Sequence, residues 1–103
     1  GLFTFNAGNG CGGLFGPGTL ILTAPSGSRA ALIAQSECVE GIESTGVQWP
    51  LHQERLRFGE SRGVSNRIHQ PPWRISTRAG VLLWLIMDVS RAAVEIEWRP
   101  APP

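Results

Sequence analysis

The last quarter of the chain carries the clearest hydrophobic pattern. Residues 81–87, VLLWLIM, are consecutive apolar residues, a run typical of a strand buried on both faces. Over residues 94–98, apolar residues alternate with glutamates, as in a half-buried antiparallel strand. We therefore predict two adjacent strands, with a second layer covering the first of them. That layer is either another sheet or a neighbouring subunit.

Shorter apolar runs nearer the N-terminus predict further strands. Residues 2–5 form a first one, and residues 19–24 and 30–35 form two more, which we interpret as a hairpin around the turn sequence PSGS. The segment between the first two runs, NAGNGCGGLFGPG, is rich in glycine. No regular structure is expected there, so this segment is predicted to be a flexible arm, a close-contact loop or a seam between subunits.

The middle of the chain is less regular. Residues 47–51 and 54–58 are short candidate strands. The mixed stretch 59–70 predicts a long surface loop, and the two prolines at 71–72 exclude a central strand at that point. Residues 73–78, WRISTR, alternate again, so we expect an exposed strand there whose arginines face water.

Short strands separated by turn signals predict an all-β fold, specifically a small antiparallel β-sandwich or jelly roll. The length of 103 residues fits one domain. We place this domain at residues 1–98, with the glycine-rich arm or loop at 1–18. Residues 99–103, RPAPP, are predicted to be a proline-rich tail, either frayed or lying along a neighbour.

Composition and charge narrow the classes of partner. The net charge is only +1, and charged residues make up 17% of the chain, below the roughly 25% that is typical. There is no excess of positive charge for nucleic acid or an anionic membrane, and no apolar run approaches the about twenty residues that span a bilayer. We therefore expect neither nucleic acid nor membrane as the main partner. A surface that is sparing with charge favours contact with protein.

Cys11 and Cys38 are a candidate disulfide. In an oxidising compartment the bond would be worth about 3 kcal/mol, and in a reducing one the two residues would be free thiols. No CxxC motif or paired histidines accompany them, so we predict no metal site. The sequence leaves the disulfide and the free thiols as open alternatives.

Residues able to carry catalysis do not form a motif. His52 and His69 have no second ligand or nucleophile beside them in the sequence. Glu95 and Glu97 share an exposed strand face, where glutamates are ordinarily solvated. The GxGxxG match at 8–13 lacks the helix that a dinucleotide site needs. We therefore predict no catalytic residues, no cofactor and no enzymatic activity.

Large aromatic side chains supply the candidates for contact with a partner. Trp49 precedes Pro50 and Trp73 follows Pro72, and in such irregular stretches a large ring is often partly exposed. Packing beneath the loops is the alternative role for both rings. Arginine is the basic residue favoured at desolvated interfaces. The predicted interface residues are Trp49, Trp73, Phe15, Arg74 and Arg78.

Two stretches resemble a known family. CGGLFGPGTLILTAP followed by Cys38 is similar to the opening of a CUB domain, and LLWLIMDVSRAAVEIEW is similar to its closing strands. The resemblance implies a secreted antiparallel sandwich that binds proteins or sugars, with Cys11 and Cys38 as its first disulfide. The second cysteine pair and the acidic calcium-site segment of that family are absent here, so we attribute the likeness to shared strand patterning.

These observations predict a non-enzymatic structural protein that assembles through subunit contacts. The first hypothesis is a capsid, decoration or tail component of a virus or phage, located in the virion, with protein partners: a homo-oligomer or other particle subunits. The alternative is a secreted, extracellular β-sandwich binding module, CUB-like or carbohydrate-binding, with one disulfide. Carbohydrate is its candidate ligand.

Overall fold

Ten strands form two five-stranded sheets within residues 2–102, the part of the chain that the computed structural model describes. The elements are β1 (Leu2–Ala7), β2 (Gly10–Phe15), β3 (Gly18–Thr23), β4 (Arg29–Ala34), β5 (Cys38–Thr45), β6 (Leu51–Arg57), β7 (Ser61–Arg67), β8 (Trp73–Thr77), β9 (Leu82–Met87), a 3₁₀ turn η1 (Arg91–Ala93) and β10 (Glu95–Pro100). Gly1 and Pro103, the ends of the predicted arm and tail, lie outside the described residues.

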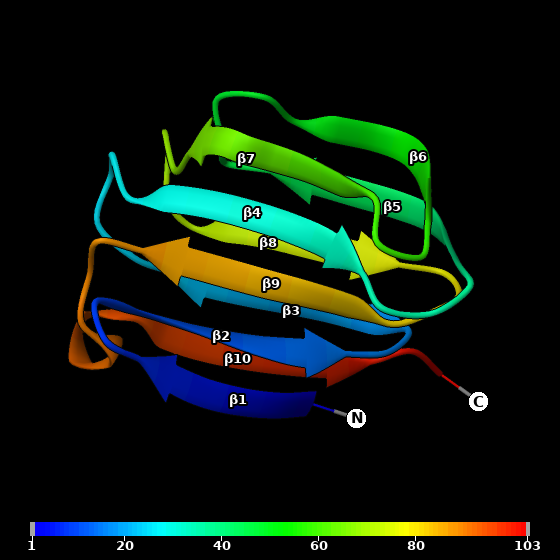
Figure 1. Ribbon diagram of the computed structural model, residues 1–103, viewed down its shortest axis with the longest axis horizontal. Helices are drawn as coiled ribbons and strands as arrows, with labels where there is room; N and C mark the ends of the chain where they lie inside the picture. The colour runs from blue at the N-terminus through cyan, green and yellow to red at the C-terminus, as the bar shows by residue number, and fades with distance from the viewer. Residues whose placement is uncertain (1, 103) are drawn as a thin grey trace.

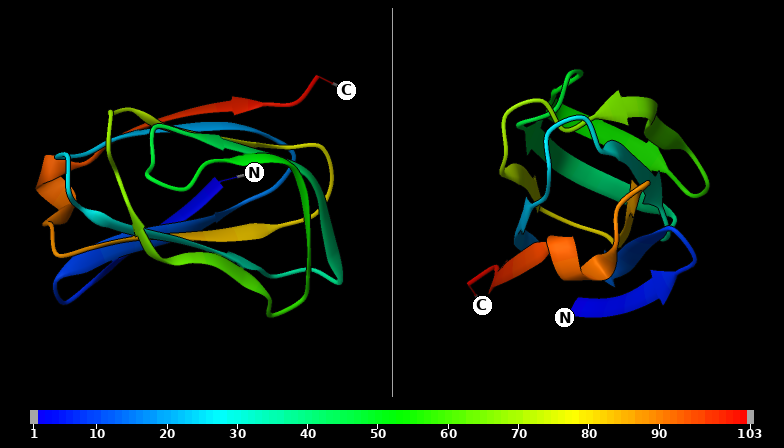
Figure 2. Two further views of the ribbon diagram at one scale, coloured as in Figure 1. Left: turned by 90° about the horizontal axis from the view of Figure 1, so that it is seen from above. Right: turned by 90° about the vertical axis from the view of Figure 1, so that its left-hand side faces the viewer.

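The sheets are antiparallel and lie face to face. The first has the strand order β1-β2-β9-β4-β7, and the second has the order β10-β3-β8-β5-β6. Figure 1 shows the first sheet in front of the second, and the left panel of Figure 2 shows the two layers from above. The prediction of an all-β antiparallel sandwich is confirmed. No helix within the described range is long and apolar enough to cross a membrane.

The core lies between the sheets because each strand alternates inward and outward side chains. From the first sheet, Trp84 and Ile86 of β9 point inward, and from the second, Leu20 of β3 and Ile75 of β8 meet them; all four are fully buried. At one end of the core the ring of Phe15 packs edge-on against Trp98, with ring centroids 5.8 Å apart.

The glycine-rich segment is a strand, which corrects the prediction of an arm or loop at 1–18. β2 lies between β1 and β9 and pairs with both along its whole length. A side chain at Gly13 would place its Cβ 2.3 Å from the carbonyl oxygen of Phe3 and 2.7 Å from Nε1 of Trp84. The glycine therefore lets the indole of Trp84 lie across β2, so here glycine serves close packing rather than flexibility.

Further corrections concern the pairing and the extent of the strands. β3 and β4 do not form a hairpin, because they belong to different sheets. The predicted loop at 59–70 contains β7, which pairs with β4. β8, predicted to be exposed, is the central strand of the second sheet. Finally, β9 and β10 lie in different sheets, and β10 includes Arg99 and Pro100 of the predicted tail.

Candidate functional site

A tryptophan projects into solvent from the loop between β5 and β6. Trp49 is 61% exposed, which is unusual for so large an apolar ring. The loop leaves the second sheet at Thr45, crosses towards the first sheet and returns at Leu51. On the way it meets β7, because the Gln48 N–H donates to the carbonyl of Arg67 at 2.9 Å. The exposed indole thus lies at the edge of the sandwich where β6 and β7 are the outermost strands.

The side chain of Asn66 fixes this loop from β7. Its Oδ1 accepts the N–H of Trp49 at 2.9 Å, and its Nδ2 donates to the carbonyl of Trp49 at 3.0 Å. The same Oδ1 accepts the N–H of Arg67 at 3.0 Å. Asn66 is only 6% exposed, so a buried amide holds both backbone groups of an exposed aromatic residue. The tryptophan is therefore anchored through its backbone while its ring stays free for a ligand.

Gly46 lets the loop begin so close to its neighbours. It has φ of +87°, and a Cβ there would lie 2.2 Å from the carbonyl oxygen of Pro72. Its own carbonyl accepts the N–H of His69 at 2.8 Å and that of Gln70 at 3.1 Å. Only glycine meets the left-handed conformation and the close backbone approach together.

The strands next to the loop are packed into the core. Trp73 is 1% exposed and donates its indole N–H to Oγ of Ser44 at 2.8 Å, which ties β8 to β5. Val47 is buried and forms an isolated antiparallel bridge with Ile68. The loop therefore lies on packed strands on both sides, as a preorganised binding surface requires.

On the second sheet, the carboxylate of Glu43 in β5 lies beside His52 and Gln53 of β6. The carboxylate of Glu43 accepts the backbone N–H of Gln53 at 2.7 Å and lies 3.0 Å from Nδ1 of His52. The Gln53 N–H, followed by the neighbouring His52, holds the pKa of Glu43 below its usual value. Gln53 adopts φ of +48° to make this contact. Within the described residues, no group of three or more His, Cys, Asp or Glu side chains is arranged to hold a metal ion.

The predicted interface residues lie in different places. Trp49 is exposed, whereas Phe15 and Trp73 are each 1% exposed and belong to the core. Arg74 is exposed on the outer face of the second sheet, between Ile21 and Thr45 on the neighbouring strands. Arg78 is also exposed and packs over Gly41, with its guanidinium 4.0 Å from Glu40. Arg74 therefore lies beside Thr45, where the loop begins, and Arg78 lies further along β5, beside Glu40.

The two cysteines lie in different sheets, Cys11 on β2 and Cys38 on β5. Both are free thiols in the part of the chain that is described. Burial raises the pKa of the Cys11 thiol, and nearby Arg91 opposes this shift. In this structure the two thiols are not bonded to each other, and the disulfide that an oxidising compartment would form stays a prediction.

Sequence reasoning missed Gly46, Asn66 and Ser44. The first gives a weak signal, since a glycine three residues before a tryptophan in a polar stretch indicates a turn. The other two give none, because their partners are 17 residues away for Asn66 and 29 residues away for Ser44. Only the fold brings these residues to the loop.

The fold defines the class of the protein as an antiparallel β-sandwich. At one edge it has a loop with an exposed tryptophan, Trp49, whose backbone is hydrogen-bonded to Asn66. The model of the family described as "Thiamin pyrophosphokinase, vitamin B1 binding domain" matches residues 25–82. That segment contains the loop, Asn66, Trp73 and Ser44, and it is more than half of the chain. The chain belongs to this family.

Solved structures agree with this fold. The chain is similar to the thiamine pyrophosphokinase of Bacillus subtilis, with a TM-score of 0.69 and 21% identity, over 77% of this chain and 37% of that one. It is also similar to the thiamin pyrophosphokinase of Geobacillus thermodenitrificans, with a TM-score of 0.66 and 20% identity, over 81% of this chain and 39% of that one. A thiamin pyrophosphokinase family protein of Enterococcus faecalis gives a TM-score of 0.66 at 16% identity, over 77% of this chain and 37% of that one. No curated protein matches the chain significantly.

The chain thus spans well under half the length of these solved structures. At these identities the structures support the fold, and the family match supports membership. The activity and substrates of the complete relatives are properties of longer chains.

The family corrects the predictions of function. A virus or phage particle component is wrong, and so is the secreted CUB-like or carbohydrate-binding alternative, because the matching family is a domain of a pyrophosphokinase. The expectation of a non-enzymatic protein is wrong for the same reason. The predicted partners and locations are wrong for the same reason. The partners were a homo-oligomer or other particle subunits, and the locations were the virion or the extracellular space. The apolar and low-charge features behind these predictions are real, but they do not identify a particle protein.

Proposed function

We propose that this chain is the thiamin-binding domain of a thiamin pyrophosphokinase and that the loop around Trp49 forms part of its thiamin site. The observation that carries the proposal is the exposed indole of Trp49, held through its backbone by the buried Asn66. It lies within the segment matched to the vitamin B1 binding family. We also propose that both sheets form a single domain, because one continuous core joins them.

The chemistry of thiamin suits such a loop. Thiamin carries a quaternary thiazolium ring, which is a permanent cation, and a flat aminopyrimidine ring. An indole face attracts a cation by about 0.5–2 kcal/mol and stacks on flat rings. Because Trp49 needs no movement of its backbone to present its ring, little ordering cost opposes binding.

The coverage of the relatives suggests which part of the enzyme binds thiamin and which part transfers pyrophosphate. The family description names the vitamin B1 binding domain of thiamin pyrophosphokinase, and more than three fifths of the B. subtilis chain lies outside the match. Transfer of a phosphoryl group depends on positioning and on charge stabilisation by metal and basic groups. We propose that this second task belongs to the part of such an enzyme that this chain does not match.

The test is a titration of the ¹⁵N-labelled chain with thiamin, following the four indole N–H signals by NMR and the affinity by calorimetry. We expect the Trp49 signal to shift most, and Trp49→Ala to weaken binding several-fold, as loss of about 0.5–2 kcal/mol implies. Phe58→Ala is the matched control, because Phe58 is 66% exposed but lies after β6, outside the loop.

A second probe separates the charge from the stacking. A neutral aminopyrimidine without the thiazolium ring is expected to bind more weakly than thiamin to the wild type, and the two ligands are expected to differ less on Trp49→Ala. Equal effects of the Trp49 and Phe58 substitutions, or no response of the Trp49 signal at saturating thiamin, would remove the loop from the site.

A further inference from the structure

The edge strand β6 contains a bulge near its beginning. In the register with β5, Ile42 pairs with Glu54, and the next inward pair is Ser44 with Leu51. A step of two residues on β5 thus matches a step of three residues on β6. The extra residue is accommodated at Gln53, which has φ of +48°, a conformation that is rare outside glycine. We call this feature the Gln53 bulge.

The bulge decides which side chain at the start of β6 packs inward. Successive residues of a regular strand face opposite sides of the sheet, so alternation continued from the buried Leu56 would turn His52 inward and Leu51 outward. The structure has the reverse arrangement. Leu51 is half-buried and packs against the core, whereas the side chain of His52 is 86% exposed. The Gln53 bulge therefore shifts the strand by one residue and directs Leu51 into the core.

Leu51 is one of two fixed points around Trp49. Only Pro50 lies between them in the chain. The other fixed point is Asn66, which holds the backbone N–H and the carbonyl of Trp49. A shift of β6 by one residue would move Leu51 out of the core or pull the loop away from Asn66. The orientation in which the indole reaches solvent therefore depends on the register that the bulge sets.

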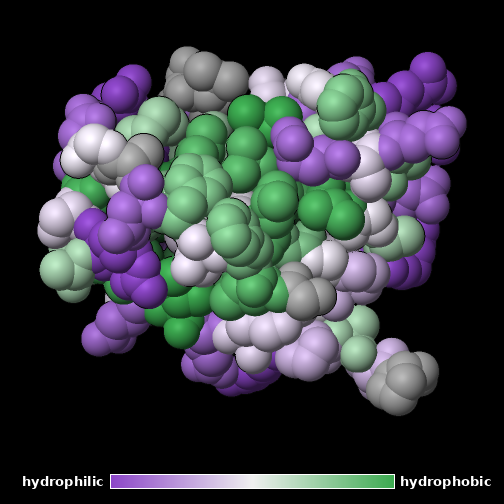
Figure 3. All heavy atoms as spheres, turned by 60° about the horizontal axis from the view of Figure 1, so that its bottom comes forward, coloured by the Kyte–Doolittle hydropathy of each residue, from purple (hydrophilic) through white to green (hydrophobic). Residues whose placement is uncertain are grey.

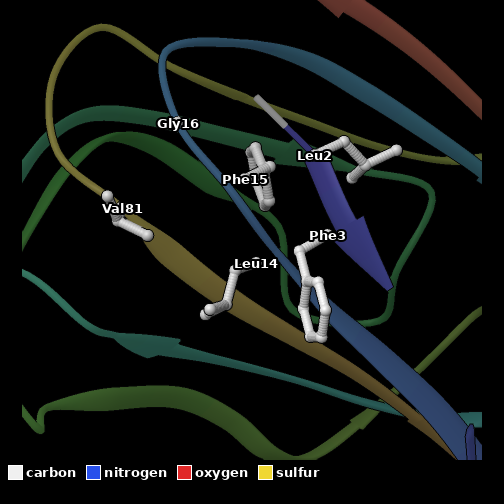
Figure 4. A pocket seen from close by; sticks show the side chains of 6 residues that line it. All are labelled: Leu2, Phe3, Leu14, Phe15, Gly16 and Val81. Carbon is white, nitrogen blue, oxygen red and sulfur yellow. The ribbon is translucent and has the colours of Figure 1, made fainter. Parts of the chain in front are cut away.

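The broad apolar surface of the domain does not place Trp49. Figure 3 shows apolar side chains gathered on the side of the molecule that carries β1 and β2. The hollow in Figure 4 has a volume of about 320 Å³ and is lined by Leu2, Phe3, Leu14, Phe15, Gly16 and Val81. These residues belong to or adjoin β1, β2 and β9, whereas the Trp49 loop meets β7 at the opposite edge of the same sheet. The exposed ring is thus placed by the strands that carry the loop.

Glu43 of β5 supplies the contacts that hold the bulge. Its Oε2 accepts the backbone N–H of Gln53 at 2.7 Å, and its Oε1 accepts the side-chain N–H of the same residue at 3.3 Å. Oε1 also lies 3.0 Å from Nδ1 of His52. A bulge leaves one residue out of the ladder between the strands. Here the carboxylate takes the place of the missing backbone acceptor, through hydrogen bonds that its charge strengthens.

We propose that Glu43 is a positioning residue for thiamin binding: its carboxylate stabilises the Gln53 bulge, and the bulge sets the register in which Leu51 packs inward and the indole of Trp49 faces the ligand. The role in binding rests on the proposed function. Glu43 acts through the backbone of β6 rather than by touching the ligand. A chain in another register still contains Trp49 but does not present it, so the apparent affinity falls with the fraction of chains in the correct register.

The test compares Glu43→Ala with the wild type by calorimetry with thiamin and by NMR of the isotope-labelled chain. We expect Glu43→Ala to bind thiamin at least about threefold more weakly, as when about a third of the chains keep the register. Without thiamin, the Gln53 amide is expected to lose protection from hydrogen exchange, and the Leu51 methyl and Trp49 indole signals are expected to shift. Glu43→Gln, which keeps one acceptor oxygen, is expected to lie between the two.

Gln53→Gly supplies the rescue. Glycine adopts a positive φ without strain, so the bulge depends less on the carboxylate. The double variant Glu43→Ala with Gln53→Gly is expected to regain an affinity within about twofold of the wild type, together with the wild-type Leu51 signals. All samples are measured well below their unfolding temperatures, so a loss of stability alone would leave the affinity of Glu43→Ala unchanged.

Glu40→Ala is the matched control. Glu40 lies on the same strand, and its carboxylate lies 3.7 Å from the guanidinium of Arg55 and 4.0 Å from that of Arg78. Its replacement removes a carboxylate of β5 without removing a contact to the bulge. This variant is expected to bind thiamin within about twofold of the wild type, since surface changes away from a contact have small effects.

Three outcomes would overturn the proposal: equal affinities of Glu43→Ala and the wild type, equal losses in the Glu43 and Glu40 variants, or no recovery in the double variant. The NMR signals keep this proposal apart from the proposed function. If the wild-type chain does not bind thiamin, the proposed function fails, and the Leu51 and Trp49 signals of Glu43→Ala still decide whether Glu43 sets the register.

Discussion

Replacing Asn66 by alanine removes three hydrogen bonds, two of which hold the Trp49 loop on β7. The lost contacts are those to the N–H of Trp49 at 2.9 Å, to its carbonyl at 3.0 Å and to the N–H of Arg67 at 3.0 Å. Asn66 is 6% exposed, so water does not freely take its place. The loop loses the contacts that fix the backbone beneath the exposed indole.

The expected cost follows from the number and setting of these bonds. A net hydrogen bond contributes about 1 kcal/mol, and a buried group left without a partner costs about 1–3 kcal/mol. The groups of Trp49 are only partly buried and regain some water, so we expect Asn66→Ala to lower the free energy of unfolding by roughly 2–4 kcal/mol. This is a large share of the about 5–15 kcal/mol that holds a small domain together.

The assay is urea denaturation followed by circular dichroism, with amide hydrogen exchange of Trp49 as the local readout. Asn66→Asp is the informative second variant, because its carboxylate still accepts both N–H groups but no longer donates to the carbonyl of Trp49. It is expected to retain protection of the Trp49 N–H, whereas Asn66→Ala loses it. Thiamin affinity of the folded Ala variant is expected to fall, because the indole is no longer held in place.

The reasoning would be refuted by a change in unfolding free energy below about 0.5 kcal/mol, the level of an ordinary surface substitution. Unchanged exchange at Trp49 in Asn66→Ala would refute it independently, since it would mean that the loop is held by other contacts.

Two further predictions concern Gly46 at the start of the Trp49 loop and the ion pair between Arg29 and Asp88. Gly46→Ala combines φ of +87° with a Cβ 2.2 Å from the carbonyl oxygen of Pro72, so we expect it to cost more than Gly27→Ala, where φ is +93° but nothing lies within 4 Å. We expect about 1 kcal/mol for Gly27→Ala and clearly more for Gly46→Ala in thermal unfolding, and equal costs would contradict the close contact. The hydrogen bond from Arg29 and its charge hold the pKa of Asp88 below its usual value. A carboxyl with a lowered folded pKa contributes stability above its unfolded pKa of about 3.9, and this contribution is lost as the pH falls through the folded pKa. Urea midpoints measured from neutral to acidic pH are therefore expected to fall less steeply for Asp88→Asn than for the wild type, and identical slopes would count against the pair.

The sequence predicts the strands whose side chains alternate or are uniformly apolar. β8 and β9 appear within two residues of the predicted ranges, because inward residues such as Ile75 and Trp84 are large and apolar. β2 and β7 were missed for opposite reasons. In β2, glycine replaces the bulky residues that mark a strand, because Trp84 and the backbone of β1 come too close for a side chain. In β7, most residues are polar because the strand is at the edge of its sheet.

Pairing is less predictable than the strands themselves. Residues 19–24 and 30–35 are separated by the turn sequence PSGS, and a hairpin is the local solution. In the structure the chain uses that turn to cross from one sheet to the other. The choice depends on which partners bury the apolar faces of β3 and β4. The paired residues of β8, β9 and β10 come 48 or more residues later.

The candidate site was only partly predictable because it contains little titratable chemistry. Trp49 was a candidate on account of its size and its place before a proline, but its support comes from a buried amide and a glycine. Neither residue type signals a site when met singly in a sequence. On the proposed function this is expected, because a permanent cation with a flat ring is recognised by an aromatic face rather than by an acid, a base or a metal ligand.

The side chains of the apolar run at 81–87 point alternately into the core and to the outer face of the first sheet. Its inward half, Trp84 and Ile86 with Leu82, is fully buried in the sandwich and follows from the fold alone. Its outward half, Leu83 and Leu85, remains half-buried after both sheets are complete, so the sandwich does not account for it. The sequence argument that such a strand needs a second covering layer therefore applies to the outer face as well as to the core. The sequence does not identify the covering layer, and its interpretation as a contact between virus particle subunits is wrong.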